Sequence, residues 1–488
     1  MISIRHLIVY LLLLGALGCG GETMRAGAGQ PHADALHVID GELGDWDGTD
    51  TATADGRYIY LTFSPDTRPV QAIQAAPYTT RIRIDADADP ATGRPIDYAI
   101  RPEAIARRPQ GVDLLIELSP LNERGSVGIG AGVTRYGADG EAVSIGHAQV
   151  GFTCLPTYAS QQYEARIDRH APGSTVLPGE GHIEIVVDQV DPQGRSLWST
   201  TMSVRLPALE EASKAAAVLP DKPADAVRIM SANVLFSAPL QDAGPFRRVL
   251  EAVDPDVILY QEWFRTTRAD VAGWLREHAG ADWTLHMPDE GSGVAIATNR
   301  PIIARYERAL PPSGDGRPAR ACAALIDTRA GELLVISVHL KCCGSADSEE
   351  DIARIAQARG IRDFVADVRK RHPGAGVVIG GDYNLVGSRR PLEALIDGLV
   401  GDGDDLSVAL PIVLGDHSGA TWVDDKSRFS PGRLDWVVYD GSVSRMEHAL
   451  LLDTRVLDAG SLEAMGLRAT DSDASDHLPI VVDLVPAE

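Results

Sequence analysis

The pattern of apolar segments changes at about residue 226, and this change limits the folds that the chain can adopt. Residues 35–206 contain short alternating strands, such as Tyr58–Phe63 and His182–Val187, between frequent Gly and Pro turns. This pattern predicts an antiparallel β-sandwich. Residues 226–488 alternate apolar strands with helical patterns, which predicts an α/β four-layer sandwich of two packed sheets flanked by helices. A length of 488 residues suits this division into two domains.

Two other segments lie outside the predicted domains. Residues 207–225 are rich in Ala, Glu, Lys and Pro without a strong apolar face, which predicts a linker. Residues 1–18 hold a basic start and an apolar run that is too short for a typical transmembrane span, and Cys19 follows.

This N-terminal order resembles a bacterial lipoprotein signal. The resemblance implies cleavage before Cys19, lipidation of its thiol, and a small polar tether over residues 19–34. The protein would then be exported and anchored by lipid to the outer membrane or cell surface. The alternative is a plain secretory signal with an incidental cysteine, which would give a secreted or periplasmic protein.

The chain is strongly acidic, with 69 Asp and Glu against 45 Lys and Arg and a formal net charge of −24. Such a surface repels polyanions at long range, which argues against non-specific nucleic-acid binding. It does not exclude a phosphate substrate, because a bound cation inverts the local field.

The cysteines after Cys19 do not demand a disulfide framework. Cys322 lies on a predicted hairpin strand opposite about Val338, so a bridge from Cys322 to Cys342 is not expected. Either a vicinal disulfide between Cys342 and Cys343 or two free thiols fits the sequence.

Polar side chains stand at the ends of two predicted C-terminal strands. Asp382 and Asn384 follow the apolar run Val377–Ile379, and Asp476 and His477 precede the last apolar run. Groups at such junctions are held rigidly at the mouth of a sheet. Carboxylate, amide and imidazole groups together can hold a hard cation, orient a water and stabilise a phosphate, which indicates metal-assisted phosphate-ester hydrolysis.

Six segments in this order resemble the endonuclease/exonuclease/phosphatase superfamily, whose members include pancreatic-type deoxyribonucleases, abasic-site endonucleases, bacterial sphingomyelinases and inositol-phosphate phosphatases. The resemblance spans about residues 227–486. The six segments are Ser231-Ala232-Asn233, Gln261-Glu262, Val338-His339-Leu340, Gly381-Asp382-Tyr383-Asn384, Arg433-Leu434-Asp435-Trp436 and Ser475-Asp476-His477.

The residues and the resemblance together suggest a metal site for Mg²⁺ or Mn²⁺. Glu262 is the best candidate ligand because it is a lone carboxylate that ends an apolar run, and Mg²⁺ typically uses one or two protein carboxylates. Asn233 and Asp476 are the further candidate metal ligands.

The resemblance also implies catalytic roles for five residues. Asp382 would orient or deprotonate the attacking water, and Asn384 would hold the water or the phosphate. His477 would stabilise the charge that develops on the phosphate, and Asp435 would fix the tautomer of His477. His339 would supply a second imidazole, as in the deoxyribonuclease-like and sphingomyelinase-like members.

Three basic residues near these segments are weaker candidates for substrate recognition. Lys341 directly follows the His339 strand, and Arg389 and Arg390 come shortly after Asn384. The alternative for the two arginines is an exposed pair at the start of a helix, before Pro391.

The predicted N-terminal sandwich resembles family-9 carbohydrate-binding and dopamine-monooxygenase-type modules, mainly over residues 38–93. Trp46 is either a sugar-stacking platform or a core tryptophan. Asp85, Asp87 and Asp89 alternate along a turn, as a Ca²⁺ site or as a solvated acidic turn. A glycan is therefore a candidate partner of this domain.

The sequence thus predicts an exported metal-dependent phosphoesterase. Its substrate would be a phosphate ester of a nucleic acid, a nucleotide, a phospholipid head group or an inositol phosphate. The alternative is a surface glycan-binding lipoprotein in which the C-terminal domain is a non-catalytic scaffold.

Overall fold

A computed structural model describes residues 36–65, 71–87, 89, 92–95, 111–121, 126–306, 319–329, 331–400 and 403–487 of the chain. The predicted signal (1–18), the lipidation site Cys19 and the tether (19–34) lie outside the described residues. None of the helices within these ranges is long and apolar enough to cross a membrane.

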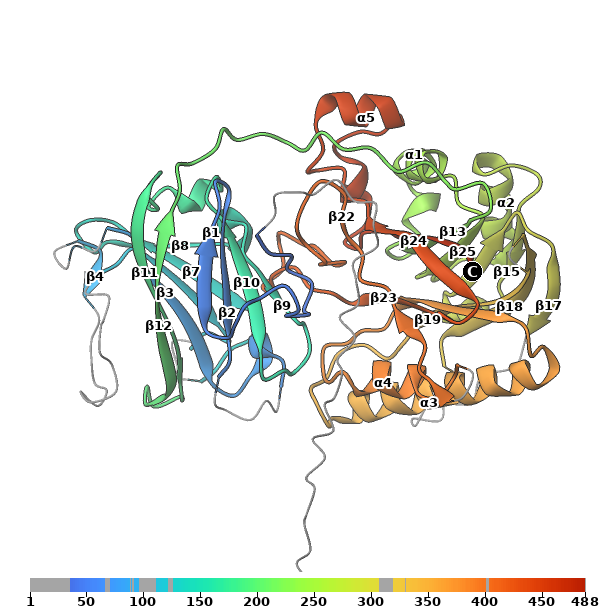
Figure 1. Ribbon diagram of the computed structural model, residues 1–488, viewed down its shortest axis with the longest axis horizontal. Helices are drawn as coiled ribbons and strands as arrows, with labels where there is room; N and C mark the ends of the chain where they lie inside the picture. The colour runs from blue at the N-terminus through green and yellow to red at the C-terminus, as the bar shows by residue number, and fades with distance from the viewer. Residues whose placement is uncertain are drawn as a thin grey trace, which may run out of the picture.

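The N-terminal region (residues 36–206) is built almost entirely from strands (Figure 1). Its elements are β1 (Thr51–Ala54), β2 (Tyr58–Phe63), η1 (Ile73–Ala75), β3 (Thr79–Asp85), β4 (Arg94–Pro95), β5 (Gly111–Val112), β6 (Leu114–Leu118), β7 (Ala131–Tyr136), β8 (Ala142–Ile145), η2 (His147–Val150), β9 (Thr153–Leu155), β10 (Tyr163–Asp168), η3 (Pro172–Ser174), β11 (Gly181–Val190) and β12 (Ser196–Leu206).

Two antiparallel sheets form the body of this region, with strand orders β1-β2-β10-β9 and β12-β11-β3-β6-β7-β8. Alternate residues of both sheets bury one apolar core, which includes Ile59, Ile82, Ile116 and Ile185, all fully buried. The strands therefore show the alternation that the sequence predicted, because each strand turns one face toward the core.

The C-terminal region (residues 226–487) combines longer strands with helices (Figure 1). Its elements are β13 (Val227–Asn233), η4 (Ala238–Leu240), α1 (Ala243–Val253), β14 (Val257–Gln261), α2 (Arg268–His278), β15 (Thr284–His286), η5 (Glu290–Ser292), β16 (Ala295–Thr298), β17 (Ile302–Tyr306), β18 (Ala321–Thr328), β19 (Gly331–His339), α3 (Glu349–Arg371), β20 (Gly376–Asp382), α4 (Arg390–Ile396), β21 (Ser407–Val408), β22 (Ile412–Val413), β23 (Asp435–Tyr439), β24 (Ser444–Leu451), α5 (Ala459–Met465), η7 (Asp471–Ala474) and β25 (Ile480–Pro486).

Two sheets are stacked at the centre of the C-terminal region. Their strand orders are β15-β16-β14-β13-β25-β24-β22 and β17-β18-β19-β20-β23-β21. An apolar core lies between them, a second core joins α3 and α4 to the six-stranded sheet, and a third joins α1, α2 and α5 to the seven-stranded sheet. The predicted stack of two sheets flanked by helices is thus confirmed for this region.

Local sequence explains where the main helices begin. The side chains of Asp242, Thr267 and Ser348 each accept a backbone hydrogen bond at the N-terminus of α1, α2 and α3, respectively.

The hairpin of β18 and β19 pairs Cys322 with Ser337, one residue from the predicted partner.

The predicted linker follows an extended path between β12 and β13 and passes α5 (Figure 1). Ala215 fixes it there: its amide donates to the carbonyl of Val456 (2.9 Å), and its carbonyl accepts from the amide of Asp458 (2.9 Å). The division into two domains with these boundaries stays a prediction.

Candidate active site

Strand register brings the polar strand ends together at one edge of the two C-terminal sheets. In the six-stranded sheet, Asp382 at the end of β20 pairs with His339 on one side and with Asp435 on the other. In the seven-stranded sheet, β13 and β14 run parallel, so Asn233 ends level with Gln261 and Glu262 follows directly. Residues far apart in sequence therefore meet because their strands end at the same level.

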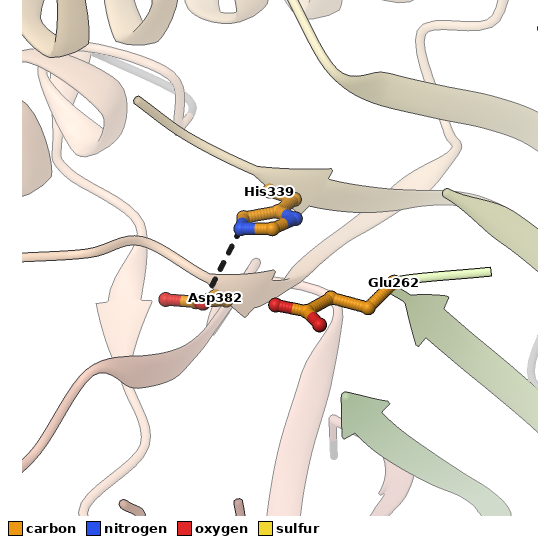
Figure 2. A group of neighbouring side chains, drawn as sticks. All are labelled: Glu262, His339 and Asp382. Carbon is orange, nitrogen blue, oxygen red and sulfur yellow. Dashed lines mark ion pairs between the residues drawn. The ribbon is translucent and has the colours of Figure 1, made fainter. Parts of the chain in front are cut away.

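Glu262, His339 and Asp382 form the first cluster of the site, and their ligand atoms lie within 4.8 Å of one another. Figure 2 shows the Glu262 carboxylate pointing toward Asp382, with the His339 ring above the two carboxylates in this view. The Nε2 atom of His339 lies 3.5 Å from Oδ2 of Asp382. Asn233 donates through its side-chain amide to the same oxygen, at 3.4 Å.

The backbone also shapes this cluster. Glu262 has a φ of 67°, a conformation that ordinary side chains rarely adopt, and its carboxylate accepts a hydrogen bond from the amide of Phe236 (3.1 Å). Such backbone strain is typical of functional positions.

Asp382, Asp435 and His477 form the second cluster. The Nδ1 atom of His477 lies 2.7 Å from Oδ2 of Asp435, and its Nε2 lies 3.9 Å from Oδ2 of Asp382. All three side chains are buried. Asp435 thus directs the Nε2 edge of the imidazole toward Asp382. The predicted role of Asp435 in fixing the tautomer of His477 stays a prediction.

The pKa values of the neighbouring groups are driven apart. Burial disfavours the charged form of His477, but the charge and hydrogen bond of Asp435 outweigh it and raise the pKa of His477 to about 10. Burial, Arg320 and His477 lower the pKa of His339 to about 3. Burial and the Asp435 carboxylate raise the pKa of Asp382 to about 8. Paired groups with opposite shifts are a mark of acid–base sites.

The donor set suits a hard divalent cation. Glu262, Asp382 and Asn233 supply carboxylate and amide oxygens, which Mg²⁺ prefers over nitrogen and sulfur. A cation beside Asp382 would favour the ionised form of this carboxylate and so oppose the burial that raises its pKa.

Asp476, the other predicted metal ligand, lies outside both clusters. Its Oδ2 accepts a hydrogen bond from Nε1 of Trp422 (2.9 Å), while its buried Oδ1 has no hydrogen-bond partner among the described residues. A free buried carboxylate oxygen is able to ligate, so a metal role for Asp476 stays a prediction.

Asn384 adjoins the clusters in an unusual conformation, with a φ of 51°. Its backbone amide donates to Oδ1 of Asp382 (2.9 Å), and its side-chain amide donates to the carbonyl of Leu340 (3.1 Å). The geometry holds Asp382 in place. The predicted contact of Asn384 with water or phosphate stays a prediction.

The three weaker basic candidates make contacts away from these clusters. Arg389 forms an ion pair with Glu42 of the N-terminal region (3.0 Å), and Arg390 pairs with Asp347. The backbone of Lys341 is fixed on α3, where its amide donates to Gln357 (2.9 Å).

Sequence reasoning missed Arg320 and Phe264 beside His339. Arg320 is exposed, and its Cζ atom lies 5.1 Å from the ring centre of Phe264. Phe264 in turn lies 5.8 Å from the ring of His339 and 5.7 Å from that of Phe236, whose side chain is exposed. Nothing in the local sequence marks these residues, although Phe264 stands two residues after Glu262.

The N-terminal candidate sites are also partly rearranged. Asp85 and Asp87 converge with Asp113, which sequence reasoning missed, whereas Asp89 is not part of that cluster. The Ca²⁺ site therefore stays a prediction. Trp46 stacks on His37 with ring centres 3.7 Å apart, so one face of the proposed sugar platform is covered.

The cysteines are free thiols in the described residues. The sulfur atoms of Cys342 and Cys343 lie 2.9 Å apart without a bond between them. Of the two states left open by the sequence, the structure thus has the free thiols.

Comparisons with known proteins find similar solved structures and a matching family. Solved structures that resemble the chain include a beta toxin mutant from Staphylococcus aureus with bound magnesium ions (18% identity, TM-score 0.37, covering 53% of this chain and 99% of that one). Others are TDP2 from D. rerio complexed with a single-strand DNA product (17%, TM-score 0.37, 53% and 98%) and sphingomyelinase C from Streptomyces griseocarneus (16%, TM-score 0.35, 53% and 99%). No substrate is transferred from structures this distant.

A search of curated proteins finds no match. The model of the Endonuclease/Exonuclease/phosphatase family matches residues 230–477, which is half of the chain and includes every predicted catalytic and metal-binding residue from Asn233 to His477. The chain therefore belongs to the Endonuclease/Exonuclease/phosphatase family and is a metal-dependent hydrolase that acts on phosphate ester bonds.

Proposed function

We propose that the protein hydrolyses a phosphate ester by in-line attack of a water that Asp382 positions, without a covalent enzyme intermediate. The observation that carries the proposal is that Asp382 belongs to both clusters. Oδ2 of Asp382 lies 3.4 Å from the amide of Asn233, 3.5 Å from His339 and 3.9 Å from His477. One carboxylate thus contacts the metal-binding side and the imidazole side of the site.

The charge of each residue suggests its role in the proposed reaction. Bound Mg²⁺ or Mn²⁺ would neutralise phosphate charge and make a water more acidic. Glu262 and Asn233 would hold the cation, and Asp382 would accept the proton of the attacking water. His477, kept protonated by Asp435, would donate from Nε2 to a phosphate oxygen as negative charge develops there. The neutral His339 would orient the phosphate by a hydrogen bond.

The residues around the site restrict the choice of substrate less than the phosphate-ester chemistry of the site does. Arg320 forms no ion pair with the described residues and provides a positive charge next to His339 in an otherwise acidic protein. Beside it, a hollow of about 380 Å³ is lined by Phe236, Leu240, Phe264 and neighbouring residues. A phosphate ester that carries an apolar or flat group fits both features, which keeps nucleotides, nucleic-acid ends and phospholipid head groups as candidates.

A substrate screen tests the proposed function. The full-length chain is assayed against DNA, nucleotides, inositol phosphates and phospholipids with Mg²⁺, Mn²⁺ or Ca²⁺, and phosphate and alcohol products are measured. We expect hydrolysis that EDTA abolishes and that Asp382→Ala or His477→Ala removes while substrate binding is retained. Full activity in chelator would exclude the proposed mechanism.

We also propose that the enzyme is exported and anchored by lipid at Cys19, because the sequence of residues 1–19 fits a lipoprotein signal. Metabolic labelling with a fatty acid in a bacterial host should mark the wild-type chain and leave Cys19→Ser unlabelled. Equal labelling of both chains would contradict the anchor.

A further inference from the structure

One loop segment of the C-terminal region forms hydrogen bonds with residues of the candidate active site. This bracing segment, residues 416–433, connects β22 to β23. The hydroxyl of Thr421, which is fully buried, accepts a hydrogen bond from the amide of Asp435 (2.9 Å). Trp422 donates from its indole to Asp476 (2.9 Å). The position of the bracing segment therefore sets the position of both carboxylates.

The N-terminal region grips the first residue of the bracing segment. Arg166 on β10 forms two hydrogen bonds to the carboxylate of Asp416, at 2.8 and 2.5 Å, and the hydroxyl of Tyr58 donates to the same carboxylate at 2.8 Å. All three side chains are buried. Burial opposes ionisation of Asp416, but Arg166 outweighs it and holds the pKa of Asp416 well below its usual range. The contact is thus a buried, bidentate ion pair, which is costly to break.

A second grip holds the later part of the bracing segment. Gln74 accepts from the amide of Ser430 (2.9 Å) and donates to its hydroxyl (2.9 Å). The amide of Ala131 donates to the carbonyl of Arg428 (2.7 Å). Both Gln74 and Ser430 are buried, so these hydrogen bonds are protected from water.

The third set of contacts involves Arg433, two residues before Asp435. Arg433 is almost fully buried, and its guanidinium lies 3.9 Å from the ring centre of Trp436. Its backbone amide donates to the hydroxyl of Thr157 (2.7 Å), and its side chain donates to the carbonyl of Asp40 (3.1 Å). N-terminal residues thus fix the backbone that leads into the catalytic strand β23.

The loop after Asn384 is held in the same way. The amide of Ala159 donates to the carbonyl of Gly387 (2.9 Å), and Glu42 pairs with Arg389 (3.0 Å). In Figure 1, β2, β9 and β10 lie on the side of the N-terminal region that faces these loops. A module that merely delivered the enzyme to a glycan would not need buried contacts to the loops behind the site.

We propose that the N-terminal region is a positioning part of the active site: it fixes the bracing segment and, through it, the Asp435–His477 pair and Asp476. The inference rests on the proposed function for its kinetic consequence. Its structural consequence, a bracing segment that loosens when the N-terminal contacts are removed, does not depend on activity.

The test uses three variants of the full-length chain. Asp416→Asn weakens the buried ion pair, and Gln74→Ala removes the hydrogen bonds to Ser430. The matched control is Asp188→Asn, which weakens another buried pair of the N-terminal region, between Asp188 and the arginines Arg81 and Arg83 at 2.7 Å. Hydrogen–deuterium exchange of peptides covering residues 416–434 is measured beside kcat, KM and Tm.

Asp416→Asn and Gln74→Ala should speed exchange in the bracing segment and lower kcat by about 10- to 100-fold, because small displacements of catalytic groups cost that much. KM should change by less than about threefold, since the phosphate-binding groups outside the segment are untouched. Asp188→Asn should lower Tm without either effect. If Asp416→Asn fails to fold, Gln74→Ala carries the test alone.

Three results would overturn the proposal. The first is unchanged exchange of the bracing segment in Gln74→Ala and Asp416→Asn. The second is faster exchange in these variants with an unchanged kcat. The third is an equal loss of kcat in Asp188→Asn, since the effect would then reflect global stability. If the wild-type chain hydrolyses no phosphate ester, the proposed function fails, and the exchange comparison still decides whether the N-terminal region fixes the segment.

Discussion

Two buried aspartates, one from each region of the molecule, are compensated differently. In the N-terminal sheets, Asp188 is 1% exposed and is held by Arg81 and Arg83, each at 2.7 Å. At the C-terminal strand ends, Asp382 is 3% exposed and has no arginine or lysine partner among the described residues, only His339 and His477 at longer distances. The first arrangement neutralises a charge inside a fold, and the second leaves a place for a cation and a proton.

The difference separates structure from function in physical terms. A buried carboxylate without a cationic partner destabilises a fold, so it is retained where a ligand or a reaction needs it. The pKa of Asp382, raised to about 8 by burial and by Asp435, expresses that cost. Variants of these aspartates should therefore separate activity from stability in opposite ways.

The largest expected effect is that of Asp382→Asn. Removal of the group that accepts the proton of water should lower kcat by about 10²- to 10⁴-fold. Tm should stay the same or rise in the absence of metal, because an uncompensated buried carboxylate is removed. Asp188→Asn should do the reverse, with a lower Tm and kcat within about twofold of wild type. Steady-state kinetics and thermal unfolding of both variants decide this, and a shared pattern would refute the distinction.

The next effect concerns Asp435, the carboxylate that supports His477. Asp435→Asn should lower kcat by about 10²-fold, because Nε2 of His477 loses its charge and its orientation. The pKa of His477 is raised from 6.5 to about 10 in the folded protein. The stability from this proton is fully present below about pH 6.5 and is lost as the pH rises through about 10.

Unfolding measurements between pH 6 and pH 10 check the sign. In Asp435→Asn the folded-state pKa of His477 falls, so the loss of stability from this group should be smaller and should end at a lower pH than in wild type. Identical pH profiles for the two chains would mean that Asp435 does not hold the proton on His477.

Metal removal should give a smaller, pH-dependent effect on stability. In chelator the pKa of Asp382 is about 8 against an ordinary value of 3.8, so folding retains a proton that the unfolded chain releases. That contribution is fully present below about pH 3.8 and is lost as the pH rises through about 8. Mg²⁺ needs the ionised carboxylate, so its stabilisation, about 2.7 kcal/mol at a hundredfold excess over Kd, should grow with pH.

Thermal shifts with Mg²⁺ and with EDTA at pH 6, 7 and 8 measure this effect. The Mg²⁺-induced rise in Tm should increase along the series in wild type and should not increase in Asp382→Asn. A constant rise in both chains would place the cation away from Asp382.

The sequence could predict the strand ends because the signal is local. Asp382 and His477 stand directly beside apolar runs, so the sequence itself marks both positions. The sequence could not predict contacts between residues that lie far apart in the chain. The pairing of Arg389 with Glu42 joins residues on the two regions, and Asp113 reaches Asp85 only through sheet register.

Secondary structure was missed where the pattern is weak. Strand β24 (Ser444–Leu451) lies second from the edge of its sheet and has half-buried residues along half of its length, so neither alternation nor a continuous apolar run marks it. The hydrogen bonds of Thr421 were not predicted for a different reason. The sequence does not reveal the partners of a threonine in a loop, and only the fold shows that its hydroxyl accepts hydrogen bonds from two backbone amides.

Thr421 gives the finest test of how the catalytic carboxylates are held. Its hydroxyl accepts from the amides of Leu434 and Asp435, each at 2.9 Å, and the Asp435 amide is buried. Thr421→Val keeps the shape but leaves these donors without a partner, at a cost of about 1–3 kcal/mol. If Asp435 is displaced as a result, kcat of Thr421→Val should fall about tenfold. Thr421→Ser keeps the hydroxyl oxygen, so its kcat should stay close to that of wild type. If Tm falls in Thr421→Val while kcat does not, the hydroxyl stabilises the loop only, and the position of Asp435 is set by its pairing with Asp382 across the sheet.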